Sequence, residues 1–168
     1  MPAYKNITMR AASIKDIKTE LEEQSQQILL ALCLKLAKFK KENKELLTYL
    51  LFEEGNESGY VQSVKAEINA AFVDLNIKNL YIAKKNLRKI LRSINRYVKY
   101  SGIKSTEASL LIHFCILVNE SKLRVDKSTA LSNLYAAQIK KIQAAIATLH
   151  EDLQYDYRRE LESLEFKV

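Results

Sequence analysis

Glycine and proline are almost absent from this chain of 168 residues, which contains three glycines, one proline and no tryptophan. A β-rich protein needs both residue types for its turns, and the phosphate-binding loops of nucleotide-dependent enzymes need closely spaced glycines. Their scarcity therefore predicts long helices joined by a few short loops. The positions that interrupt the helical pattern are Pro2, Gly55, Gly59 and Gly102.

The chain also lacks the sequence motifs of common enzyme and metal sites. It contains no glycine-rich dinucleotide loop, no phosphate-binding P-loop, no HExxH motif and no EF-hand loop. Neither histidine follows a glutamate by three positions, as a di-iron bundle requires. We expect His113 to be a hydrogen-bonded core histidine. The sequence thus predicts a protein that is not an enzyme, with no catalytic residue, no metal site and no cofactor.

Long hydrophobic runs are missing as well, and we expect no secretory leader. Residues 1–10 contain no apolar segment, and the most apolar stretches, 28–34 and 110–118, are too short to cross a bilayer. The two cysteines, Cys33 and Cys115, lie inside apolar helical runs, which is typical of buried free thiols in a reducing compartment. We therefore expect a cytoplasmic protein that does not contact membranes.

Apolar residues recur with the 3.6-residue period of α-helices along most of the chain. Ser13 and Asn43 are candidate N-caps, and Gly102 is a candidate C-cap. Residues 106–118 are apolar on nearly all sides, which predicts a helix at the centre of a bundle. We expect an all-α protein: a single-domain bundle of six to eight antiparallel helices over residues 13–168, after a poorly ordered arm at 1–12. A short HEAT-like superhelix of helical hairpins is the alternative.

Two segments of this bundle leave alternatives open. Residues 127–164 contain no helix breaker, and one continuous helix there would be about 55 Å long, which exceeds the size of a compact domain of this length. Either the helix breaks near His150, or its far end packs against a second copy, which would make a homo-oligomer through the C-terminal helix. The segment 53–59 is expected to be a solvated acidic loop, and Ser105 or Thr106 to cap the helix after Gly102.

Negative charge is absent from one long segment. Nine lysines and arginines and no acidic residue lie between Leu75 and Thr106, whereas the rest of the chain carries 18 basic and 20 acidic residues. The net charge of +7 therefore comes from this segment alone. A local field of one sign indicates the kind of partner rather than the fold.

The helical period places most of these charges on one side of a helix predicted over residues 79–100. Its apolar residues share one face, and Tyr81, Ile82 and Tyr100 project toward the charged side. Arginine can hold a phosphate or carboxylate through two hydrogen bonds, which lysine cannot. The candidate anion-contacting residues are Lys85, Arg88, Lys89, Arg92, Arg96 and Lys99.

Three interpretations of this basic stripe remain open from the sequence. In the first, it is a solvated face or is neutralised within the fold by acidic helices, for which the candidates are residues 20–23 and the acidic run 151–165. In the second, it binds an acidic protein surface. In the third, it contacts the phosphate backbone of nucleic acid without reading sequence. We expect a non-enzymatic interaction or scaffold protein, with an acidic protein as the first partner class and nucleic acid as the alternative.

Overall fold

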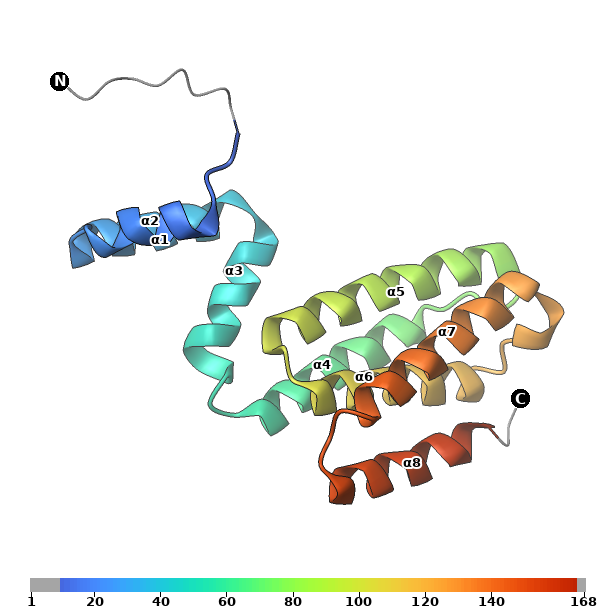
Figure 1. The fold of residues 1–168 in the computed structure, drawn as a ribbon. Coiled ribbons are helices and arrows are strands. Elements are labelled where there is room, and N and C mark those ends of the chain that lie inside the picture. Colours follow the sequence, from blue (N-terminus) through green and yellow to red (C-terminus); the bar gives the residue numbers. More distant parts are fainter. Residues whose placement is uncertain (1–9, 166–168) are drawn as a thin grey trace. The chain divides into compact units, whose positions relative to one another are not determined.

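The computed structural model describes residues 10–165, and every regular element among them is helical (Figure 1). Eight α-helices are present in this part of the chain, which confirms the all-α class. The chain divides into two compact units, residues 1–47 and residues 48–168, where the sequence predicts one domain from residue 13 onward. We call them the N-terminal unit and the C-terminal unit and describe each by itself. Most of the predicted arm at 1–12 lies outside the described residues.

The N-terminal unit contains α1 (Ile14–Glu22), α2 (Gln26–Phe39) and most of α3 (Lys41–Thr48). Ser13 caps α1, as predicted, by accepting a hydrogen bond from the backbone N–H of Asp16 at 3.2 Å. Ser25 caps α2 in the same way, and the chain reverses direction between these two helices (Figure 1). The prediction that Asn43 is an N-cap is wrong. It lies inside α3, and its amide donates a hydrogen bond to the carbonyl of Leu36 at 2.8 Å.

No residue between positions 10 and 47 is buried, although this segment is rich in large apolar side chains. The prediction of a buried Cys33 is therefore wrong, because this thiol is exposed. Serine side chains cap α1 and α2, but too few other helices surround them within this unit to cover their apolar faces. The large apolar side chains exposed in this segment are Ile14, Ile17, Leu21, Ile28, Leu30, Leu32, Leu34, Leu36, Phe39 and Leu46.

The C-terminal unit begins with one π-helical turn and continues through five α-helices. The segment after the turn is shorter than the predicted loop at 53–59, because α4 already starts at Glu57. The joint between α4 and α5 lies at residues 74–79, and α5 has nearly the bounds predicted for the helix at 79–100. The elements are the π-helix Tyr49–Glu53, α4 (Glu57–Val73), α5 (Leu80–Ser101), α6 (Lys104–Glu120), a 3-10 turn (Val125–Lys127), α7 (Thr129–Ile146) and α8 (Glu151–Glu165).

Helix α6 lies at the centre of this unit and contacts α4, α5, α7 and α8. Eight of its 17 residues are buried, as the prediction for residues 106–118 requires. Phe114 is completely buried, and its ring lies edge-on to that of Phe72 on α4 with the centroids 5.7 Å apart. A helix without a polar face can be stable only with such cover on several sides.

The long segment without a helix breaker forms two helices. Helix α7 ends at Ile146, and α8 begins at Glu151 after a bend. Helix α8 then packs back on α6 and α7, with Leu161 and Leu164 buried. Because this break brings the last helix into the unit, the length of the segment gives no reason to expect a homo-oligomer through the C-terminal helix. None of the described helices is both long enough and apolar enough to cross a membrane.

Candidate interaction surface

Helix α5 turns its apolar side toward the interior of the C-terminal unit. The side chain of Asn79 caps its first turn by accepting hydrogen bonds from the backbone N–H groups of Tyr81 at 3.0 Å and Ile82 at 3.1 Å. Gly102 ends the helix in the left-handed conformation, with φ at 68°, as the sequence predicts. The opposite side of the helix faces solvent. The residues buried between the two caps are Ala83, Leu87, Ile90, Leu91 and Ile94.

The six predicted anion-contacting residues lie on that solvent side, and we call them the basic face of α5. Five are exposed, whereas Arg96 is half-buried, with its guanidinium carbon 5.3 Å from the ring centroid of Tyr97. The five exposed side chains form no ion pair with any described residue. They therefore present their charge to solvent. These five residues are Lys85, Arg88, Lys89, Arg92 and Lys99.

The described acidic side chains of α8 form no ion pair with this face. Helices α5 and α8 run along opposite sides of the C-terminal unit, with α4, α6 and α7 between them (Figure 1). The one ion pair formed by a described acidic residue of α8 joins Asp152 to its own neighbour His150, 3.5 Å away. The sequence leaves open that the acidic run at 151–165 neutralises the stripe. No contact among the described residues supports that interpretation.

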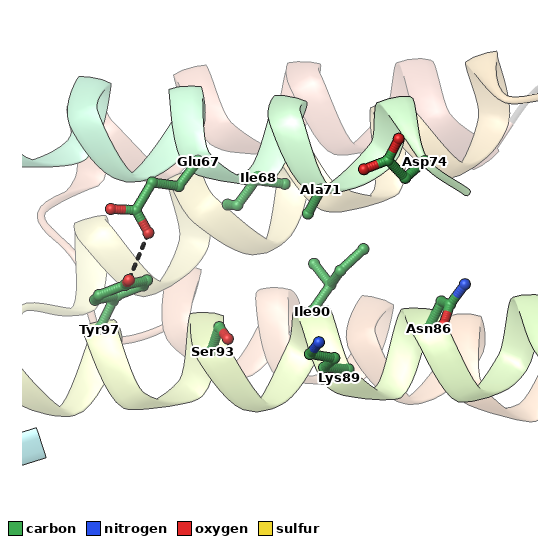
Figure 2. Close-up of a pocket in the computed structure, with 9 residues that line it drawn as sticks. All are labelled: Glu67, Ile68, Ala71, Asp74, Asn86, Lys89, Ile90, Ser93 and Tyr97. Atoms are coloured by element: carbon green, nitrogen blue, oxygen red, sulfur yellow. Dashed lines mark hydrogen bonds between the residues drawn. The ribbon is translucent and has the colours of Figure 1, made fainter. Parts of the chain in front are cut away.

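A groove of about 330 Å³ opens between α4 and α5, beside the basic face. Figure 2 shows residues on both sides of this groove, with Glu67 and Ile68 of α4 and Ile90 of α5 pointing into the space between the helices. Ile68 and Ala71 of α4 and Ile90 of α5 supply its apolar floor. Apolar floors with a few polar groups around them are typical of binding grooves.

The two edges of this groove carry opposite charge. Glu67 of α4 and Asp74, the C-cap residue directly after α4, contribute carboxylates, and α5 contributes Lys89 of the basic face (Figure 2). The carboxylate of Glu67 accepts a hydrogen bond from the hydroxyl of Tyr97, which ties the two edges together near one end. Lys89 therefore belongs to the basic face and to the groove at once.

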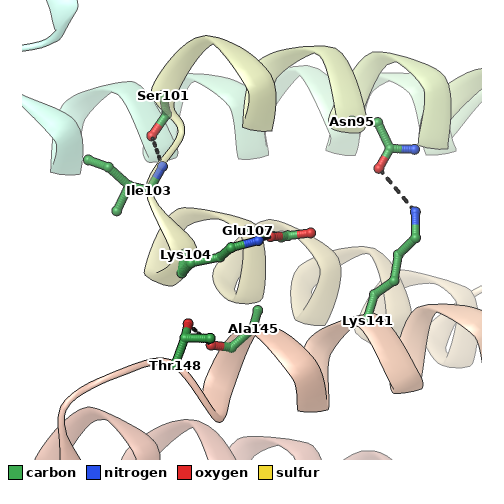
Figure 3. Close-up of polar contacts among 8 residues, drawn as sticks. All are labelled: Asn95, Ser101, Ile103, Lys104, Glu107, Lys141, Ala145 and Thr148. Carbon is green, nitrogen blue, oxygen red and sulfur yellow. Dashed lines mark hydrogen bonds and ion pairs between the residues drawn. The ribbon is translucent and has the colours of Figure 1, made fainter.

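The other edge of α5 lies toward α7. Asn95 accepts a hydrogen bond from the ammonium group of Lys141 at 3.5 Å (Figure 3). Asn95 and the groove residue Ser93 are two positions apart, so they point about 200° apart around the helix. The basic face thus lies between two flanking helices. Lys104, one of the nine basic residues counted in the sequence, pairs instead with Glu107 at 2.7 Å (Figure 3).

Two bulky side chains stand exposed at the start of α5. Tyr81 is 72% exposed, and the ammonium nitrogen of Lys84 lies 5.7 Å from its ring centroid. Ile82 is 38% exposed. An aromatic ring and an aliphatic side chain beside a row of cations offer anchoring contacts in addition to charge.

A polar cluster that the sequence does not reveal is centred on Glu57. The sequence predicts a solvated loop at this position. Glu57 lies in the first turn of α4 instead, and its carboxylate accepts hydrogen bonds from the hydroxyl groups of Tyr49 at 2.9 Å, Ser101 at 2.5 Å and Thr106. Thr106 is buried inside α6 and is not its N-cap, which is Ile103. The cluster joins the π-helix, α4, α5 and α6, which indicates a structural role.

His113 of α6 is hydrogen-bonded, as predicted, but it is half-buried and not a core residue, whereas Cys115 is fully buried. The Nε2 of His113 is 2.7 Å from the side-chain oxygen of Asn69, and the residue does not line the α4–α5 groove. Partial burial, together with the nearby charge of Lys65, lowers the pKa of His113. Burial raises the pKa of the Cys115 thiol to about 12, so it remains protonated at neutral pH.

The described residues form no candidate metal site, and comparisons with known proteins give no match. Among residues 10–165, no group of three histidine, cysteine, aspartate or glutamate side chains is placed to hold a metal ion. Searches with protein-family models, against curated proteins and against solved structures each give no match to this chain. The chemistry of the surface itself is therefore the basis for assigning a function.

Proposed function

We propose that this protein is a non-enzymatic interaction module that presents the basic face of α5 to an acidic surface of a partner protein. The observation that carries the proposal is the set of five exposed cations on α5 that form no ion pair with the described residues. Charges left without partners inside a fold are available for electrostatic complementarity with another molecule. The proposed function uses no metal, cofactor or catalytic group.

The adjoining groove favours a protein over nucleic acid. A phosphate backbone that followed the stripe into the groove would approach the carboxylates of Glu67 and Asp74, which repel it. It would also leave the apolar floor formed by Ile68 and Ala71 without a matching group. A protein can place carboxylates on the cations, apolar side chains on the floor and a basic residue near the two carboxylates.

An amphipathic helix with an acidic face is the partner geometry that fits best. From Lys85 to Lys99 the stripe extends about 21 Å at 1.5 Å per residue, which corresponds to about four turns of a partner helix. A helix that lies in a groove uses apolar anchors three and four residues apart. Tyr81 and Ile82 would contact one end of such a helix.

Fluorescence anisotropy with labelled probes tests this proposal. The first probe is an amphipathic peptide with glutamates on one face and leucines on the other, and a scrambled peptide of the same composition is its control. Single-stranded RNA and duplex DNA are the competing probes, each measured at several salt concentrations. We expect the amphipathic peptide to bind at least about tenfold more tightly than the scrambled peptide, because only the former fills the groove.

Two charge-matched variants make the result specific to α5. Lys85→Glu, Arg88→Glu and Arg92→Glu together should abolish binding of the amphipathic peptide. Reversing three exposed lysines elsewhere in the C-terminal unit should preserve it. Steeply salt-dependent binding of RNA or DNA, with no preference for the amphipathic peptide, would favour the nucleic-acid alternative. No binding of any probe would contradict the proposal. The control substitutions are Lys122→Glu, Lys127→Glu and Lys140→Glu.

A further inference from the structure

The N-terminal unit has apolar surface that its own described residues do not cover. It contains 47 residues, and no residue from 10 to 47 is buried. Chains below about 40 residues usually need disulfides, metals or oligomerisation to fold, and slightly longer ones are marginal. The sole cysteine of this unit, Cys33, is a free thiol, and no described group of residues is placed to hold a metal ion. The cover for these apolar side chains must therefore come from outside the N-terminal unit.

The uncovered surface is concentrated on α2. Leu30 is 60% exposed, Leu34 47%, Leu36 59% and Phe39 75%. Leu30 and Leu34 are four positions apart and share one face, whereas Leu36 points about 160° away from Leu34. Most of the circumference of α2 is therefore apolar and exposed. Contiguous apolar patches of this kind mark interaction surfaces.

Charge along the same segment is divided by sign. Between Thr19 and Leu34 the sequence contains three glutamates and no basic residue, and they lie close to the turn between α1 and α2. Between Lys35 and Lys41 it contains four lysines and no acidic residue, at the other end of α2. The 14 residues of α2 extend about 21 Å, so the two groups of charge lie at opposite ends of the helix.

We propose that the α2 helices of two copies of this chain pack antiparallel and form a homodimer through the N-terminal unit. In this arrangement the acidic turn of each copy meets the basic end of the other, twice, by two-fold symmetry. The exposed leucines of the two α2 helices cover one another. The helix dipoles also oppose one another, which adds a small favourable term.

A second copy fits this surface better than an unrelated partner, because the surface is complementary to itself. An acidic partner would be repelled at the turn by Glu20 and Glu23, and a basic partner would be repelled at the other end by Lys35 and Lys38. A parallel pairing of two copies would place like charges together at both ends. The antiparallel pair alone joins opposite charges at both ends.

Sedimentation of the full chain over about two decades of protein concentration tests the proposal. We expect a reversible monomer–dimer equilibrium. Glu20→Lys with Glu23→Lys should raise the dimer dissociation constant at least about tenfold, because each substitution acts twice across a symmetric interface. Lys35→Glu with Lys38→Glu should do the same. Mixing these two variants should restore a dimer that contains one copy of each, because acidic ends then meet basic ends again.

Two further variants test whether the dimer forms through the apolar surface of α2. Leu30→Glu with Leu34→Glu should also prevent dimer formation, whereas Glu160→Lys with Glu162→Lys on α8 should leave it unchanged, as a control for net charge. A wild-type chain that stays monomeric at every concentration would overturn the proposal. It would indicate that other residues of the same chain cover the apolar surface of α2. A dimer that the N-terminal variants do not weaken would overturn it too, because the interface would lie elsewhere.

Discussion

The two units of this chain obey the same local rules and differ in what their helices bury. Serine side chains cap α1 and α2 in the N-terminal unit, and a serine caps α7 in the C-terminal unit. Among the residues that the structure describes, the buried ones nevertheless lie from Tyr49 to Leu164, and none lies between positions 10 and 47. Caps and periodicity thus determine where a helix begins and ends. Burial depends on how many other helices surround it.

The two units also carry their charge differently. In the N-terminal unit, acidic and basic residues are separated along the axis of α2, so that the surface is complementary to a copy of itself. In α5, charge of a single sign occupies one side of the helix, and a copy of the same surface would be repelled. The first pattern fits the proposed self-association, and the second fits the proposed partner of different chemistry.

The largest expected difference between the two units is the loss of stability when one apolar side chain is truncated in each. Phe114→Ala removes a completely buried ring from the centre of the C-terminal unit and should lower its free energy of unfolding by about 3–5 kcal/mol. Leu30→Ala in the N-terminal unit should cost less than about 0.5 kcal/mol in dilute protein, because that side chain is exposed. Urea denaturation of both variants measures the contrast. Equal losses would contradict the assignment of the core to the C-terminal unit.

Loss of the Glu57 carboxylate should have the next largest effect. Glu57→Ala leaves the buried hydroxyl of Thr106 without its acceptor and removes the bonds from Tyr49 and Ser101. We expect a loss of about 1–3 kcal/mol in the free energy of unfolding. Glu54→Ala, at the exposed turn before α4, is the matched control and should be nearly neutral. A neutral result for Glu57→Ala would show that the cluster does not stabilise the junction of the four elements.

Features encoded by neighbouring residues could be predicted from the sequence. The cap at Ser13, the C-cap at Gly102 and the centrally packed segment 106–118 are all confirmed. The solvent-facing placement of the basic stripe follows from helical spacing alone, and five of its six residues are exposed as that spacing implies. Each of these features is set within one helix or one turn.

Features that depend on distant residues could not be predicted. The partners of Glu57 include Ser101 and Thr106, 44 and 49 positions away, and no local pattern indicates them. The exposure of Cys33 has a related cause. An apolar helical run indicates a surface that requires cover, but the run does not say whether the same chain supplies it.

The smallest expected effect concerns the basic face and distinguishes a binding surface from a structural one. Lys85→Gln, Arg88→Gln and Arg92→Gln together should change the free energy of unfolding by no more than about 0.5 kcal/mol, because these side chains form no ion pair with the described residues. Any change should be a gain that fades as salt is added, since like charges three and four positions apart on a helix repel one another. Urea denaturation at low and high salt measures both effects. A loss above about 1 kcal/mol would indicate that the stripe is paired within the fold. An unchanged stability would mean that the stripe contributes nothing to folding and that its charges remain available to a partner.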